Sequence, residues 1–158
     1  MFANSPRLMA LVSIFTAFLL TACGGPESDS SQSEFAFGAP ADPANATRTI
    51  EVDTTDALAF EPAEMAVTAG ETITFRVINN GEIIHDFTLG DEATQQEHEE
   101  EMAEMPGMAH DQANNVTVAS GETKELTWAF TEPGTVLIGC HQPGHYAAGM
   151  KGQITVGS

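Results

Sequence analysis

Seventeen residues near the carboxyl end, VLIGCHQPGHYAAGMKG at positions 136–152, hold most of the chemical information in this chain. In a β-strand, Cys140 shares one face with the aliphatic residues two and four positions before it, so its thiol points inward where the strand ends. His145 and Met150 follow at intervals of five residues, and the glycines and proline around them let the loop bend back. A thiolate, an imidazole and a thioether at one point are donors that select copper. The segment therefore predicts a strand leading into a metal-binding loop.

The surrounding chain, residues 48–158, has the texture of a β domain. Apolar and polar residues alternate over short stretches such as 73–77 and 126–130, and turn sequences such as Asn79-Asn80-Gly81 separate these stretches. About eight short strands at this spacing predict an all-β, antiparallel Greek-key sandwich or barrel.

An acidic segment, residues 91–111, interrupts the strand pattern. It holds eight acidic residues and no Lys or Arg, and residues 92–104 are mostly good helix formers. Pro106-Gly107 would end such a helix. We therefore expect one short helical insert, around residues 92–105, between two strands.

The metal-binding loop lacks one donor, because a blue-copper site needs two histidines, one cysteine and a weak axial methionine. His141 should point to the face opposite Cys140, and two other histidines lie in the acidic insert, which leaves His85. The missing ligand should come from a distant strand, since a loop alone would not hold the geometry rigid.

With this order of residues, the sequence resembles the cupredoxins, the family of plastocyanin, azurin and pseudoazurin. The resemblance covers residues 48–158 in strand pattern, and its specific part is His85 followed by Cys140, His145 and Met150. It implies one type 1 copper ion with His85 and His145 as equatorial nitrogen ligands, Cys140 as the thiolate and Met150 as the axial thioether.

The chain departs from the family at the residue after the first histidine. Many cupredoxins have Asn there to tie the two ligand loops together, whereas this chain has Asp86. An ionised carboxylate at that place would favour oxidised over reduced copper. The disulfide of azurin is also missing.

The amino terminus reads as an export signal over residues 1–22. Arg7 precedes an apolar run at residues 8–20, which is too short for a membrane span. The sequence Leu20-Thr21-Ala22-Cys23-Gly24 looks like the lipobox of bacterial lipoproteins, in which Cys23 is lipidated and becomes the first residue after cleavage. The alternative is a simple secretory signal that leaves Cys23 free.

A linker should follow, because residues 23–47 are rich in Ser, Ala, Gly and Pro. We expect a lipid-anchored protein on the outer side of a membrane, in the periplasm or an equivalent extracytoplasmic space. With Cys23 lipidated, Cys140 is the remaining thiol, so we expect no disulfide.

The charge of the chain limits its partners. It has 158 residues, with 23 Asp and Glu against five Lys and Arg, and a formal net charge of −18. Such acidity argues against nucleic acid and against an anionic membrane surface, so membrane contact should run through the lipid alone. A redox partner such as a cytochrome or an oxidase should present a basic docking face.

The acidic insert is also a candidate for a second copper site. Its candidate ligands are two histidines and three methionines, namely His98, Met102, Met105, Met108 and His110. Thioethers together with imidazole favour Cu(I). The alternative is that the methionines are an apolar stripe that packs the helix on the barrel. The insert also resembles a loop in periplasmic cupredoxins linked to copper tolerance.

Three functions follow from these observations. The first is a membrane-tethered one-electron carrier of the cell envelope that cycles between Cu(I) and Cu(II). The second is an envelope protein of copper handling and copper tolerance that binds or oxidises Cu(I), and the third is a structural module with a vestigial site. We do not expect an enzyme of the multicopper oxidase type, because the sequence has no His-x-His pair.

Overall fold

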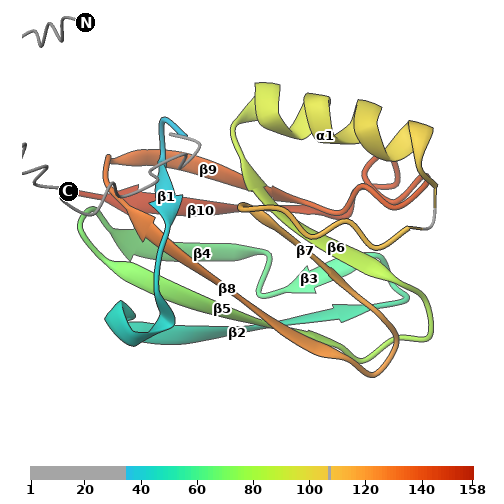
Figure 1. Cartoon of the computed structure of the whole chain (residues 1–158), viewed down its shortest axis with the longest axis horizontal. Helices are drawn as coiled ribbons and strands as arrows, with labels where there is room; N and C mark the ends of the chain where they lie inside the picture. Colours follow the sequence, from blue (N-terminus) through green and yellow to red (C-terminus); the bar gives the residue numbers. More distant parts are fainter. Residues whose placement is uncertain (1–34, 107) are drawn as a thin grey trace, which may run out of the picture. The chain divides into compact units, whose positions relative to one another are not determined.

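The computed structural model describes residues 35–106 and 108–158. The expected signal peptide and the expected lipidation site, Cys23, lie outside the described residues. Two five-stranded sheets and one α-helix make up most of the described chain (Figure 1).

The two sheets confirm the all-β sandwich. The first has the spatial order β1 (Gly38–Pro40), β8 (Thr123–Phe130), β5 (Thr72–Asn79), β2 (Arg48–Thr55) and β3 (Ala59–Glu61). The second has the order β4 (Glu64–Thr68), β10 (Lys151–Gly157), β9 (Gly134–Gly139), β6 (His85–Gly90) and β7 (Asn115–Val118).

The sequence prediction needs two corrections in the sheets. Ten strands are present among the described residues rather than about eight, because β1 and β3 span only three residues each, too few to show an alternation. The sandwich is not wholly antiparallel either, since β2 pairs in parallel with β5, and β4 with β10. Alternation reports which face is buried and carries no information about strand direction.

Aromatic side chains fill the space between the sheets. Phe75 of β5 lies 5.3 Å from Phe87 of β6, measured between ring centroids, and Phe60 meets Phe87 edge to face. Phe130 packs edge to face against Phe75. All four side chains are buried, so this core joins the two sheets.

The folded domain begins before Arg48, the boundary that the sequence analysis expects. Residues 38–40 form β1, which pairs with the edge of β8, and Pro43–Asn45 form a short 3₁₀ helix, η1. Phe37 stacks on Trp128 at 5.2 Å, and Phe35 contacts the same indole edge to face. Two isolated aromatic residues in a polar segment give no periodic signal, so their packing is not visible in the sequence.

The acidic insert contains the expected helix, α1 (Glu92–Glu104). The Asp91 side chain accepts a hydrogen bond from the Thr94 N–H and caps the first turn. The helix lies against the outer face of the second sheet and packs on β6 and β9, with Gln95, His98 and Met102 buried (Figure 1). Within the part of the chain that the structure describes, no helix is long and apolar enough to cross a membrane.

Candidate metal centre

Neighbouring strands bring the predicted copper ligands together. His85 is the first residue of β6, and Cys140 directly follows β9, which pairs antiparallel with β6. His145 and Met150 lie in the loop between β9 and β10. Residues separated by 55 positions in the chain therefore meet at one end of the second sheet.

The distances fit a single metal ion. The Cys140 Sγ atom lies 3.9 Å from Nδ1 of His85 and 3.3 Å from Nδ1 of His145. A metal bonded at about 2.0 Å to nitrogen and about 2.3 Å to sulfur would hold those atoms roughly 3.5–3.8 Å apart. The two observed separations lie on either side of this range, so the three donors fit one ion with little movement.

Backbone hydrogen bonds hold the ligand loop in shape. The Met150 N–H donates to the His145 carbonyl, and the Cys140 N–H donates to the Met150 carbonyl. Gly149 has a φ of 101°, a conformation that glycine adopts at little cost, and this turn returns Met150 to the site. His85, Cys140 and Met150 are fully buried, whereas His145 is partly exposed.

Asp86, which stands where many cupredoxins have Asn, ties the two ligand segments together. Its backbone N–H donates to the Cys140 Sγ atom over 3.3 Å, and its carboxylate Oδ1 accepts a hydrogen bond from the Gln142 side chain over 2.9 Å. Both residues are buried. The departure from the family pattern therefore preserves the link between the loops while placing a carboxylate beside the site.

Burial shifts the pKa of each donor toward its neutral form, which favours metal binding at the two histidines and opposes it at the cysteine. Desolvation raises the pKa of the Cys140 thiol to about 12, so a metal ion must displace its proton. Desolvation lowers the pKa of His85, with the His145 charge as a second cause, and desolvation also lowers the pKa of His145. Both imidazoles are thus held neutral, the form that donates a lone pair to a metal.

His141 points away from the metal site, as the strand register predicts. Its Nδ1 atom lies 2.6 Å from a Glu99 carboxylate oxygen, and its Nε2 atom lies 2.7 Å from the Gln95 side-chain oxygen. The Tyr146 ring stacks on the His141 ring with centroids 4.4 Å apart. Sequence reasoning missed Gln95, Glu99 and Tyr146, because no local pattern in the polar helix or in the ligand loop marks them as partners of His141.

The structure brings the two histidines of the expected second site together. His98 and His110 stack with ring centroids 6.0 Å apart, and Glu101, which the sequence analysis did not single out, lies with them. The three methionines have different surroundings: Met102 is buried, Met105 is half-buried and Met108 is 58% exposed.

Two imidazoles, one thiol and a buried methionine at the end of a two-sheet sandwich define a type 1 copper protein. The sequence profile of the copper-binding proteins of the plastocyanin/azurin family matches residues 46–157, and the chain belongs to this family. Copper is therefore its metal, and His85, Cys140, His145 and Met150 form the candidate type 1 site.

Several individual proteins are similar to this chain. The copper-resistant cuproprotein CopI of Rubrivivax gelatinosus is 42% identical over 120 residues, which cover 76% of this chain and 73% of that protein. The copper-resistant cuproprotein CopI of Pseudomonas aeruginosa is 41% identical, with coverage of 77% and 82%. Among solved structures, an auracyanin from Roseiflexus castenholzii matches with a TM-score of 0.63 and 29% identity, covering 72% of this chain and 99% of the auracyanin.

Proposed function

We propose that this chain is a type 1 copper protein of the cell envelope that contributes to copper resistance. The convergence of His85, Cys140 and His145 on one point supports the copper chemistry. The similarity to two proteins named copper-resistant cuproprotein, at 42% and 41% identity, supports the resistance role over other roles in the family. Auracyanin-B, by comparison, is 30% identical to this chain.

Copper in this site would supply a one-electron Cu(I)/Cu(II) couple. The chain contributes burial, which excludes water from the His85 and Cys140 donors, and a set of backbone hydrogen bonds that keeps the loop in one geometry. A site that holds its donors in place needs little rearrangement when the charge of the metal changes. The partly exposed His145 offers the exit for an electron.

The second candidate function is a one-electron carrier tethered to the membrane through lipidated Cys23. The similarity to an auracyanin whose structure is of a dithionite-reduced form favours this redox role. Its partner would be a cytochrome or an oxidase with a basic docking face, because the chain has a net charge of −18. Neither function makes the chain an enzyme in its own right.

A deletion strain grown in excess copper tests the proposal and separates the two functions. Loss of copper tolerance, restored by the wild-type gene and not by a Cys140→Ser gene, would support the resistance role. Glu132→Gln, an exposed change on the turn before β9, is the matched control and should restore tolerance. Unchanged tolerance together with slower respiration would refute the resistance role in favour of the carrier.

A further inference from the structure

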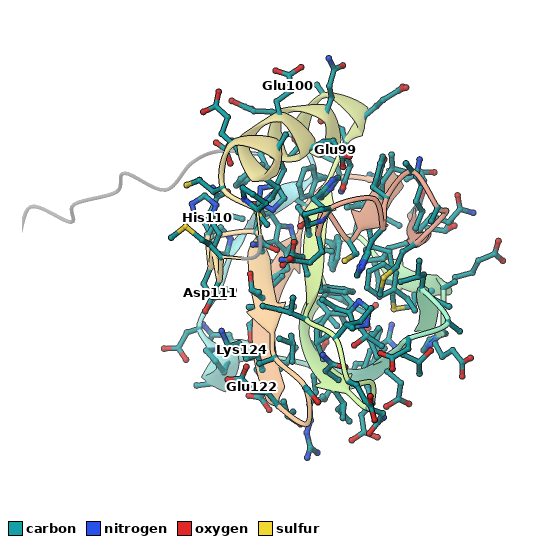
Figure 2. All side chains as sticks on the ribbon, turned by 90° about the vertical axis from the view of Figure 1, so that its right-hand side faces the viewer. Glu99, Glu100, His110, Asp111, Glu122 and Lys124 are labelled. Carbon is teal, nitrogen blue, oxygen red and sulfur yellow. The ribbon has the colours of Figure 1, made fainter. Side chains whose placement is uncertain are left out.

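Three metal-ligating side chains meet beneath helix α1, outside the type 1 site. His98 and Glu101 lie one turn apart on α1, and His110 lies on the segment that runs from the helix to β7. One donor atom from each residue lies within 4.8 Å of the others, and Nδ1 of His98 is 3.4 Å from a Glu101 oxygen. Figure 2 shows His110 on the segment beneath the helix, while Glu100 projects from its outer side.

Two nitrogen atoms of this cluster are buried without a hydrogen-bond partner. His98 is 3% exposed, and its Nε2 atom has no hydrogen-bond partner. The Nδ1 atom of His110 is also buried and also lacks a hydrogen-bond partner. A buried polar atom without a partner costs about 1–3 kcal/mol, so such atoms are rare unless a ligand accounts for them. Two of them in stacked imidazole rings point to a bound species that accepts a nitrogen lone pair.

The charge and the access of the cluster suit a cation. The segment 91–111 holds eight carboxylates and no Lys or Arg. A cleft of about 270 Å³ opens beside the cluster and is lined by His98, Glu101 and Gln112, among others. A metal ion can therefore reach His98 and Glu101 from solvent, and the surrounding carboxylates would raise its local concentration.

The donor types decide which metal. Two imidazoles and a carboxylate are borderline to hard ligands, which suit divalent first-row ions, and among these Cu(II) binds such donors most tightly. The set expected from the sequence combines the same two histidines with three methionines, and those thioethers would favour Cu(I) instead. Met108 is 58% exposed, whereas Met102 is buried.

The cluster is connected to the type 1 site through aromatic contacts. The His98 ring meets the His141 ring edge to face at 5.1 Å, and His141 is the neighbour of Cys140 in the chain. His98 of the cluster is thus linked to Cys140 of the type 1 site by one ring contact, with His141, and by the peptide bond between His141 and Cys140.

We propose that His98, Glu101 and His110 form a second metal site, which binds a divalent first-row cation with preference for Cu(II). This inference goes beyond the proposed function, which rests on the type 1 site alone. The experiment starts from protein that carries one copper ion in the type 1 site. Cu(II) is then added in steps, and its binding is measured by electron paramagnetic resonance and metal analysis.

Wild-type protein should bind a second Cu(II) whose electron paramagnetic resonance signal shows nitrogen hyperfine structure. This second ion should add nothing to the thiolate charge-transfer band of the type 1 site. Glu101→Gln and His110→Gln should each weaken this binding by more than about tenfold. Both residues are only partly buried, so these variants should fold, whereas a change at buried His98 would also disturb the packing of the helix. Glu100→Gln removes the same charge from the exposed neighbour and should leave the binding unchanged.

Two results would overturn the second site. One is a stoichiometry that stays at one copper ion per chain. The other is second-ion binding that survives Glu101→Gln and His110→Gln but disappears when Met102, Met105 and Met108 are all changed to Leu, which would assign it to thioethers. The thiolate band at the start reports the type 1 site separately, so its absence would count against the proposed function and not against the second site.

Discussion

We expect the Gln95 side chain to hold helix α1 against the second sheet and to position His141. Its side-chain nitrogen donates to the carbonyls of Thr88, at 3.0 Å, and Leu137, at 3.3 Å, and its oxygen accepts from His141 at 2.7 Å. Gln95 is only 1% exposed. Gln95→Leu keeps the volume but removes three hydrogen bonds worth about 0.5–1.5 kcal/mol each, so unfolding should become easier by roughly 3 kcal/mol.

Thermal unfolding of the copper-free protein, followed by circular dichroism, measures this loss. For a domain of this size, 3 kcal/mol corresponds to a melting temperature lower by roughly 10–15 °C. Gln96→Leu is the matched control, because Gln96 is exposed and its side chain bonds only to Glu100 on the same helix. Equal melting temperatures for the two variants would refute the idea that the buried amide fastens the helix.

Three further predictions concern the packing, the pH response and the axial ligand. Phe37→Ala should lower the free energy of unfolding by about 3 kcal/mol in urea titrations, because it removes the stack on Trp128; a loss under about 1 kcal/mol would show that β1 is dispensable. Copper-free protein should lose stability as the pH falls from about 7.5 towards about 5.5, since the folded-state pKa values of His85 and His145 are lowered and the unfolded chain binds more protons there. A urea midpoint that is constant over this range would contradict that reasoning. Met150→Leu should keep the thiolate colour and raise the reduction potential in voltammetry, whereas loss of all copper would show that Met150 is more than a weak axial ligand.

The type 1 ligands were predictable because their chemistry and their local register are both properties of the chain. The alternation before Cys140 fixes the direction of its thiol, and a soft donor set in one loop indicates copper before any fold is known. The helix in the acidic insert was predictable for a similar reason, since helix formers followed by Pro106 are a local signal. The fold class follows from repeated short alternations in the same way.

The remaining features depend on contacts between segments far apart in the chain. The parallel pairing of β2 with β5, the docking of Phe37 on Trp128 and the link from Gln95 to His141 join residues that no local pattern connects. Sequence alone therefore determined the donor types, their order and the sandwich class. The tertiary structure decided where the domain begins and that Glu101 lies with His98 and His110, because distance and burial arise only when the chain packs.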